Sequence, residues 1–358
     1  MTRSTNDIPA WVRYLAEAGR LTPSADNSQP WRFVFDGHVL GVEFEPSRGG
    51  ALGQDHPAVL LAFGALEENL RQAAAHAGID TTAWRPGDFP AGERLLTIPA
   101  PPQSELPDAP PPALSQRHTN RAPFRTEPLP ENLKTILAAM TEGNIRVQVF
   151  DRRDQIHHLA DLVRRASRLR FQSEKIHRWL AQSLRFTPEE AARGDGLAVE
   201  TLALPPGGKA LSRLLADWRR QAFLNRFGIH RLLARIEASQ LTRCGALVAL
   251  TGPADEAAAW LAAGRLLQRV WLRLTEDGIA VHPYFVLPDL LQRLTRGDIP
   301  AAQREFARRT AAATRAFLGE PQLFMLLRTG VPRKTPPRAA RLPLEAILTL
   351  GTANRRQT

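Results

Sequence analysis

The stretch that decides the fold is TPSADNSQPWRF, residues 22–33. Pro23 and Pro30 fix their own φ angles and disfavour the α conformation in the residue before each. The small and short polar side chains between the prolines let a ligand approach the backbone closely. Pro23-Ser24 could also open a single helical turn, whose free N–H groups suit an electron-rich ligand. The alternating run from Trp31 predicts a strand, so the stretch is either a plain helix-to-strand loop or a ligand-contacting turn.

A second unusual stretch is RHTNRAPF, residues 117–124. Its two arginines and one threonine supply bidentate guanidinium donors and a hydroxyl, which is what a phosphate group requires. A lone arginine is usually a solvated surface charge, so this motif would be weak evidence by itself.

Together the two stretches resemble motifs of the nitroreductase-like, FMN-dependent flavoproteins. The first resembles the signature PSxxNxQPWxF, and the second resembles R-x-[ST]-x-R-x-F. The resemblance implies that one side of the flavin ring system lies against Pro23, Ser24, Ala25, Asn27 and Gln29. It also implies that the FMN phosphate is held by Arg117, His118, Thr119 and Arg121. Trp31 is expected in the core rather than stacked on the flavin.

Two further segments align with that family. VHPYFV, residues 281–286, aligns with the stretch beside the flavin N5 atom, and Phe285 and Val286 stand where a Glu-Gly pair often occurs. The family's C-terminal K-x-R before Leu-Pro aligns with residues 339–341. Arg341 keeps the arginine, but alanine stands at the lysine position, for which Arg338 or Lys334 could compensate.

Composition sets the broad class. The chain has 358 residues, 43% of them apolar, and a net charge of +11. Its single cysteine, Cys244, excludes a disulfide framework and reads as a buried thiol before an apolar run. The nine histidines show no metal-ligand spacing, so no metal is expected. No signal region or membrane span is evident, which indicates a cytoplasmic protein. Because the arginines are spread along several helices, we expect neither a nucleic-acid partner nor a membrane partner.

The apolar periodicity predicts an α+β fold, nitroreductase-like by resemblance, with mixed and antiparallel sheets wrapped by helices. The expected order is a helix capped by Asp7 and ending near Gly19, then a hairpin turning at Asp36-Gly37, then a central helix over 57–77. Later elements are helices at 131–140, 153–170, 256–276 and 298–318 and strands at 146–150, 245–251, 279–285 and 322–328. Seven prolines in residues 99–112 indicate a semi-rigid connector.

The domain prediction is a first half over 1–98, a proline-rich linker over 99–113 and a second half over 114–358. Residues 171–240 are helical, basic and longer than the core requires, so they are either an inserted lid or ordinary packed surface helices. The halves show a faint repeat. One copy of each motif, in different halves, indicates a fused pseudo-dimer with one complete FMN site and one decayed site. In this it resembles the tandem, Acg-type FMN-binding branch of the superfamily.

The function implied by the resemblance is hydride transfer from NAD(P)H through FMN to a small nitroaromatic or quinone-like acceptor. The flavin N5 carries that chemistry, so no catalytic side chain is expected. The alternatives are a catalytically silent flavin store or sensor with a lid over FMN, and a basic nucleic-acid binder. The assembly is expected to be a monomeric pseudo-dimer or a homodimer of it.

Overall fold

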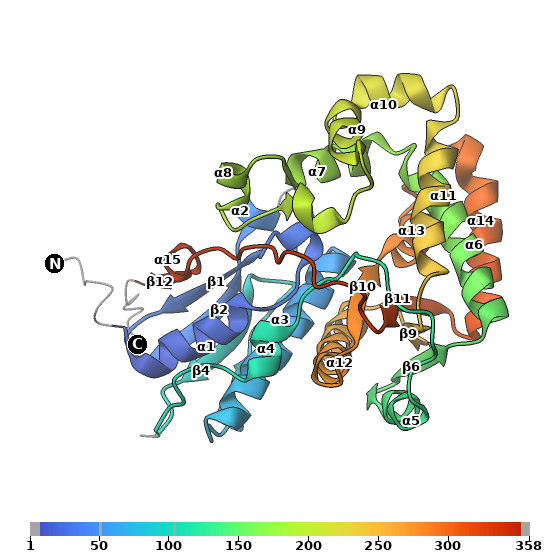
Figure 1. Cartoon of the computed structure of the whole chain (residues 1–358). Helices are drawn as coiled ribbons and strands as arrows, with labels where there is room; N and C mark the ends of the chain where they lie inside the picture. The colour runs from blue at the N-terminus through green and yellow to red at the C-terminus, as the bar shows by residue number, and fades with distance from the viewer. Residues whose placement is uncertain (1–7, 50–51, 103–104, 352–358) are drawn as a thin grey trace.

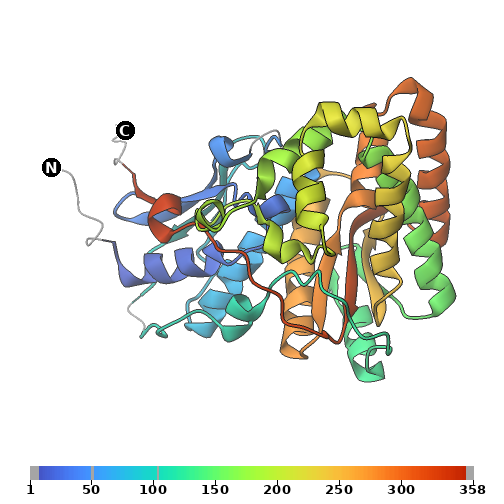
Figure 2. The ribbon, with the colours of Figure 1, turned by 45° about the horizontal axis from the view of Figure 1, so that its top comes forward.

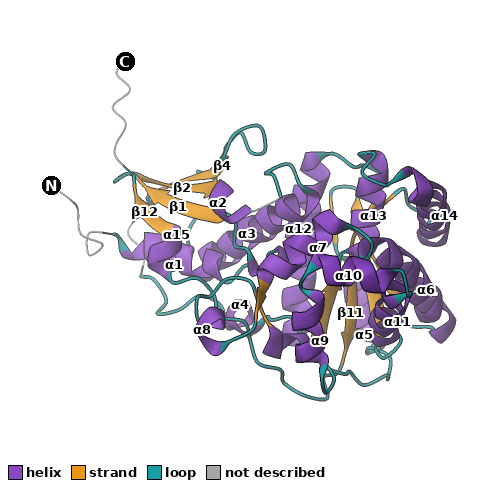
Figure 3. Cartoon of the chain, turned by 90° about the horizontal axis from the view of Figure 1, so that it is seen from above, coloured by secondary structure: helices purple, strands orange, loops and turns teal. Residues whose placement is uncertain are grey.

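The computed structural model describes residues 8–49, 52–102 and 105–351. Two five-stranded sheets form the framework (Figures 1 and 3). Sheet A has the order β12 (Leu348–Leu350), β1 (Trp31–Phe35), β2 (Val39–Phe44), β4 (Arg94–Pro99), β3 (Arg85–Pro86). Sheet B has the order β10 (Ala280–Tyr284), β11 (Gln322–Gly330), β9 (Ala246–Gly252), β6 (Ile145–Phe150), β5 (Thr141–Glu142). A small parallel pair joins β7 (Leu184–Arg185) to β8 (Leu197–Ala198).

Helices surround both sheets, which confirms the α+β class with mixed and antiparallel sheets. In the first part of the chain they are α1 (Ala10–Arg20), α2 (Pro46–Gly49), α3 (Pro57–His76), α4 (Pro112–Gln116), α5 (Glu131–Ala139) and α6 (Arg153–Arg170). Residues 171–241, for which we keep the name insert without deciding between lid and ordinary surface helices, hold α7 (Glu174–Ser183), α8 (Pro188–Ala191), α9 (Gly208–Leu215), α10 (Trp218–Asn225) and α11 (Ile229–Leu241). The rest are α12 (Ala257–Glu276), α13 (Val286–Thr295), α14 (Ala301–Leu318) and α15 (Leu344–Ile347).

The helices α3 and α12 cross at the centre of the molecule, where their backbones touch. A Cβ atom built on Gly64 would lie 2.0 Å from the carbonyl oxygen of Leu261, and one built on Gly264 would lie 2.2 Å from that of Leu61. Only glycine allows so close a crossing. The predicted central position of the helix at 57–77 is thereby confirmed: fifteen of its residues are buried.

Beyond the crossing, polar side chains of α12 contact polar side chains of α3 and β5. Arg265 on α12 forms ion pairs with Glu67 (2.9 Å) and Glu142 (2.8 Å), and Arg269 pairs with Glu142 (2.6 Å). The amide of Gln268 donates a hydrogen bond of 2.6 Å to Asn69. These arginines therefore meet carboxylates contributed by other parts of the chain.

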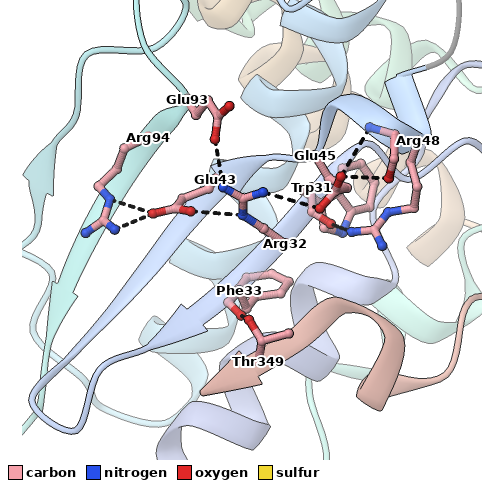
Figure 4. Close-up of polar contacts among 10 residues, drawn as sticks. Trp31, Arg32, Phe33, Glu43, Glu45, Arg48, Glu93, Arg94 and Thr349 are labelled. Carbon is pink, nitrogen blue, oxygen red and sulfur yellow. Dashed lines mark hydrogen bonds and ion pairs between the residues drawn. The ribbon is translucent and has the colours of Figure 1, made fainter. Parts of the chain in front are cut away.

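The strand β1 carries the first motif into sheet A, and Figure 4 shows the contacts that hold it there. Arg32 pairs with Glu43 on β2 at 3.0 Å and with Glu93 at 2.7 Å. Arg48 donates to the backbone carbonyls of Gln29 (3.1 Å) and Trp31. The side chain of Trp31 is fully buried, as predicted.

The C-terminal part of the chain returns from sheet B to sheet A. After β11 an extended arm, residues 331–343, leads to α15 and to β12, which pairs in parallel with β1. Figure 4 shows the hydroxyl of Thr349 facing the carbonyl of Phe33, at 3.4 Å. The sequence did not predict α15 or β12. The division of the chain into 1–98, 99–113 and 114–358 stays a prediction.

Most predicted elements form within two residues of the expected bounds. The predicted helix at 298–318 begins three residues late, at Ala301, behind Pro300. A further helix, α13, occupies residues that the prediction left unassigned. The Asp36-Gly37 turn forms, with Gly37 at φ 103°, a conformation that favours glycine. Asp7 lies outside the described residues, and Pro9 stands at the N-cap of α1. None of the helices described here is long and apolar enough to cross a lipid bilayer.

Candidate functional site

A cavity of about 640 Å³ lies where the first motif, the second motif, the central helices and the insert meet. Figure 2 shows helices of the insert, coloured green to yellow, in front of this central region. The volume falls within the range of about 300–1,000 Å³ that is usual for small-molecule and cofactor sites. Its wall includes Pro23, Ser24, Ala25 and Asp26 of the first motif, Thr119 and Arg121 of the second, Leu61, Ala62 and Ala65 of α3, Leu267 and Trp271 of α12, His282 to Tyr284 of β10, Phe285 and Val286.

The first motif forms a tight turn built around a short 3₁₀ helix, Ala25–Asn27. Three of its non-glycine residues have left-handed backbone angles: Asp26 (φ 49°), Asn27 (φ 58°) and Gln29 (φ 49°). Such angles cost free energy and persist only where the surroundings enforce them. The hydroxyl of Ser24 accepts a 2.9 Å hydrogen bond from the backbone N–H of Gln29, which closes the turn. Strain of this kind is frequent at ligand-binding turns.

The side chains of Asn27 and Gln29 do not line the cavity. Both donate to the carbonyl of Gly194 in the insert, at 3.1 Å and 2.8 Å. Asn27 also donates to the carbonyl of Ala340 (3.0 Å) and accepts from Arg341 (2.5 Å), while Gln29 accepts from the N–H of Leu342 (3.1 Å). These two side chains therefore tie the turn to the insert and to the C-terminal arm. Their assignment as cofactor contacts stays a prediction.

The second motif reaches the cavity because it adds to the edge of β10. Thr119 forms a parallel bridge with Val281, and the N–H of Asn120 donates to the carbonyl of Val281 at 2.9 Å. This pairing sets Thr119 and Arg121 beside His282 in the cavity wall. The guanidinium of Arg121 makes one long hydrogen bond, 3.5 Å, to the carbonyl of Thr201.

Next to the cavity wall, Arg117 and Arg341 carry positive charge that no carboxylate of the described residues pairs with. Arg117 is 5% exposed, and its guanidinium lies 4.6 Å from the ring centroid of Trp271. It donates to the carbonyl of Leu21 at 2.7 Å, while its Nε atom is buried without a partner. Burial, and then the charges of Arg341 and Arg338, hold the pKa of Arg117 well below its usual value. Burial also lowers the pKa of Arg341 to about 10, and Arg20 adds to this.

Among the described residues, Arg117, Arg121, Arg338 and Arg341 form no ion pair within 4 Å. Asp26 supplies Arg121 with some attraction at a longer distance. For Arg117, burial without a counter-charge is costly, because the guanidinium loses its hydration and gains no attraction in return. His118 lies in the same region, with its Nδ1 atom 2.8 Å from the carbonyl of Gln116 and its Nε2 buried without a partner. Arg338 is exposed and donates to the carbonyl of Ser115 at 2.7 Å. The cluster is suited to an anionic group.

Several titratable groups in the cavity wall were not predicted as site residues. Burial raises the pKa of Asp26, against an opposing hydrogen bond from Trp179 of the insert and the charges of Arg121 and Arg170. Burial also raises the pKa of Asp289 on α13. Burial, then Arg121 and Arg328, hold the pKa of His282 well below its usual value, and its Nδ1 atom has no partner.

The structure thus brings seven of the predicted site residues to one cavity and places the other six around it. In the wall are Pro23, Ser24, Ala25, Thr119, Arg121, Phe285 and Val286; outside it are Asn27, Gln29, Arg117, His118, Arg338 and Arg341. The insert residues in the wall, such as Trp179 and Leu180, were missed. Their only signal was the basic, helical insert itself, which has no motif to align.

Comparisons with known proteins were made for sequence and for structure. None of the known protein-family models matches this chain. A curated relative, an uncharacterized protein of Mycobacterium tuberculosis designated MT1398, is 27% identical over 305 residues. The match covers 82% of this chain but spans only 41% of the relative's length.

Solved structures similar to this chain include three FMN proteins. A nitroreductase from Bacteroides fragilis with bound FMN has a TM-score of 0.36 at 9% identity, over 69% of this chain and 96% of its own. The FMN-dependent nitroreductase NfnB from Mycobacterium smegmatis, solved with NADPH, has a TM-score of 0.37 at 20% identity. The match covers 67% of this chain and 96% of NfnB. An iodotyrosine deiodinase bound to FMN and 3-iodo-L-tyrosine has a TM-score of 0.32 at 14% identity, over 69% and 98%.

Proposed function

We propose that this protein binds FMN in the central cavity and acts as an oxidoreductase of the nitroreductase type. The observation that carries the proposal is a set of three guanidiniums, buried Arg117 and half-buried Arg121 and Arg341, in and around a cavity whose wall includes the strained turn of the first motif. An anionic group in reach of these arginines would offset the cost of burying them. The ribityl phosphate of FMN carries nearly two negative charges and suits them.

The residues present fit that cofactor. Arg117, Thr119, Arg121 and Arg341 would hold the phosphate, and His118 lies in the same region with its Nε2 atom buried without a partner. The apolar wall of α3 and α12, together with Pro23, Ser24 and Ala25, would lie along the flat ring system. Phe285 and Val286 contribute apolar surface on the β10 side. FMN supplies the redox chemistry when bound, accepting a hydride from NAD(P)H and passing electrons to a small organic acceptor.

The chain's own part in the reaction is positioning and exclusion of water. The alanines of α3 leave room for a flat molecule, and Trp179 of the insert closes the opposite side. The hydrogen bond between Trp179 and Asp26 joins the insert to the first motif across the cavity. Burial raises the pKa of Asp26 and of Asp289, so these two carboxyl groups of the cavity wall take up a proton more readily than exposed ones.

The proposal is tested by the absorption spectrum of the purified protein and by one double variant. We expect flavin absorbance in the parent protein, with FMN released on denaturation. Arg117→Ala with Arg121→Ala is expected to give a colourless protein with an unchanged far-ultraviolet circular dichroism spectrum. Arg152→Ala with Arg308→Ala is the matched control, because both residues are exposed and neither lines the cavity. Unchanged flavin content in the first variant would remove the phosphate assignment.

A second function, flavin binding without turnover, is supported by the insert. Ten residues between 173 and 237 line the cavity, so a nicotinamide must enter past them. Phe285 and Val286, both apolar, also stand where a Glu-Gly pair often occurs in the family that this sequence resembles. Anaerobic addition of NADH or NADPH distinguishes the two functions. Rapid bleaching of the bound flavin supports the oxidoreductase, and an oxidised flavin spectrum that does not change supports the silent binder.

A further inference from the structure

Three helices of the insert, α9, α10 and α11, expose large apolar side chains that are not packed into the interior of the protein. Large apolar side chains on these helices and on the turn between α10 and α11 are well exposed: Phe227 (76%), Phe223 (57%), Leu232 (50%), Leu214 (44%), Ile236 (43%) and Leu211 (40%). They account for six of the eight exposed large apolar side chains among the described residues. The other two, Ile136 and Val331, lie elsewhere in the chain. We call these six side chains and the arginines named below the insert face.

The apolar residues recur at helical spacing. Leu232 and Ile236 are four residues apart on α11, Leu211 and Leu214 are three apart on α9, and both spacings bring side chains to one side of a helix. Phe223 and Phe227 are in edge contact, with ring centroids 5.3 Å apart. Other residues of the same helices, including Leu215, Gln221 and Leu233, line a smaller cavity of about 150 Å³ beneath them. The insert face is therefore the outer side of these helices.

The same helices carry positive charge without matching negative charge. Five exposed arginines accompany the apolar residues: Arg219, Arg220, Arg226, Arg231 and Arg235. None of the five has an ion pair in the part of the chain that the structure describes. The two acidic residues of the three helices and their links are already engaged, since Asp217 caps α10 and Glu237 pairs with Arg170 at 2.8 Å. The charges of Arg231 and Arg235 also help to lower the pKa of Arg168 on α6.

The insert face lies at the rim of the molecule. Figure 1 shows α10 at the outer edge, beyond α7 and α9, and Figure 3 shows α9, α10 and α11 at the surface when the molecule is seen from above. Because the arginines are spread along the chain, the sequence alone predicted no membrane partner. The fold gathers five of them on adjoining helices, next to exposed phenylalanines and leucines.

We propose that the insert face docks on the surface of an anionic lipid bilayer. Protruding apolar side chains that enter the headgroup boundary, flanked by cations that attract anionic lipids, are the features of an interfacial membrane site. A second copy of the chain fits less well, because a face that meets itself would bring like-charged arginines together. Nucleic acid would attract the arginines but leave the aliphatic residues Leu211, Leu214, Leu232 and Ile236 in water. The proposal is independent of flavin binding.

The direct experiment is sedimentation of the full chain with lipid vesicles at low ionic strength. The vesicles are phosphatidylcholine alone and phosphatidylcholine with phosphatidylglycerol. We expect at least tenfold tighter binding to the vesicles that contain phosphatidylglycerol. Absence of binding to them, or equal binding to both kinds, would overturn the proposal.

Two pairs of variants divide the interaction into its parts. Phe223→Ser with Phe227→Ser is expected to weaken binding at least tenfold, because two exposed aromatic rings no longer enter the lipid boundary. Arg219→Gln with Arg220→Gln is expected to weaken it about five- to twentyfold. The matched controls, Ile136→Ser with Val331→Ser and Arg308→Gln with Arg309→Gln, should leave binding within twofold of the parent. Binding that survives the phenylalanine substitutions would be electrostatic adsorption and would contradict the proposal.

A reporter variant guards against misfolding of the substituted proteins. Phe227→Trp is expected to show an emission shift to shorter wavelength with phosphatidylglycerol vesicles and none with phosphatidylcholine alone. Two other outcomes would reassign the insert face. One is a dimer in lipid-free size-exclusion chromatography that Phe223→Ser with Phe227→Ser dissociates. The other is tighter binding to a single-stranded oligonucleotide than to the vesicles, lost in the arginine variant.

Discussion

Two groups of buried or half-buried arginines stand close together in this molecule and differ in what faces them. At the crossing of α3 and α12, Arg265 and Arg269 meet carboxylates of Glu67 and Glu142 within 3 Å. At the cavity, Arg117 has a single carbonyl contact, from Leu21, and the ring of Trp271. The first group is complete within the chain, and the second is not. The difference teaches that counter-charge, rather than burial alone, separates an arginine that holds the fold from one that we propose to bind an anionic ligand.

The largest expected effect tests the crossing that holds the first group together. Gly64→Ala should lower the free energy of unfolding by more than about 4 kcal/mol, or give insoluble protein, because the added Cβ would lie 2.0 Å from a backbone oxygen. Chemical denaturation measures it. Ala75→Ser, which adds one heavy atom to an exposed position of the same helix, is the control and should change stability by less than about 0.5 kcal/mol. Equal stability of the two variants would show that the helices can separate freely.

The next effect concerns His56, which belongs to the cavity wall and to the N-terminus of α3. It caps the N-terminus of α3, lines the cavity, and its Nδ1 accepts a 3.2 Å hydrogen bond from the N–H of Ala58. Burial, and then Arg296, lower the pKa of His56 to about 4. The unfolded chain takes up this proton near pH 6.5, and the folded chain does so only near pH 4. Stability from this group is therefore present above pH 6.5 and falls as the pH drops to 4, by up to about 3 kcal/mol.

This pH dependence is measured by denaturation at pH 7 and pH 4.5 in the parent and in His56→Asn. Asparagine keeps an acceptor at the N-cap but does not titrate in this range. The parent should lose more stability than the variant between the two pH values. Parallel losses in both proteins would show that His56 is not a buried neutral group.

A smaller effect tests the paired arginines themselves. Arg265→Met should lower the free energy of unfolding by about 2 kcal/mol, because Glu142 and Glu67 each lose an ion-pair partner in a partly buried setting. Flavin content should stay at the parent level. Arg178→Met removes an exposed pair with Glu174 and should cost less than about 1 kcal/mol. A loss of flavin in the Arg265 variant would contradict the separation of the arginines into a structural group and a ligand-binding group.

The smallest effect has the opposite sign and tests the unpaired group. In flavin-free protein, Arg117→Met should raise the free energy of unfolding by about 1 kcal/mol, because an uncompensated buried charge is replaced by an apolar side chain. The same variant should fail to retain flavin. Thermal unfolding of the flavin-free parent and of the variant under the same conditions shows whether the substitution raises or lowers the free energy of unfolding. A clear destabilisation would mean that the hydrogen bond from Arg117 to Leu21 matters more than the missing counter-charge.

Much of the fold could be predicted because local physics fixes it. The prolines at 23 and 30 shape the turn, the apolar alternation from Trp31 makes a strand, and the apolar residues of 57–77 make a buried helix. Cys244 is buried as expected, and burial raises the pKa of its thiol to about 12. The helix α13 was missed: residues 279–285 were predicted as a strand, and the next ten residues were assigned to no element.

The candidate site was predictable only where a motif marks it. The two motif stretches were recognised from residue types and spacing, and they do share a cavity. Trp179, His56 and Asp289 carry no such pattern, since an aromatic, a histidine or an aspartate on a helix is usually unremarkable. Their place in the wall depends on how the insert and α13 pack, which no spacing within either segment encodes.

By itself, the sequence determined the turn at residues 22–33, the arginines of 117–121 and the glycine that permits a close helix crossing. Proline geometry, hydrophobic periodicity and the absence of a side chain act within a few residues, so they can be read locally. Only the tertiary structure decided that Asn27 and Gln29 turn toward Gly194 and the arm at 340–342, and that the chain's last strand joins β1. Those contacts join residues more than 160 positions apart, and they form only once both sheets and the insert are in place.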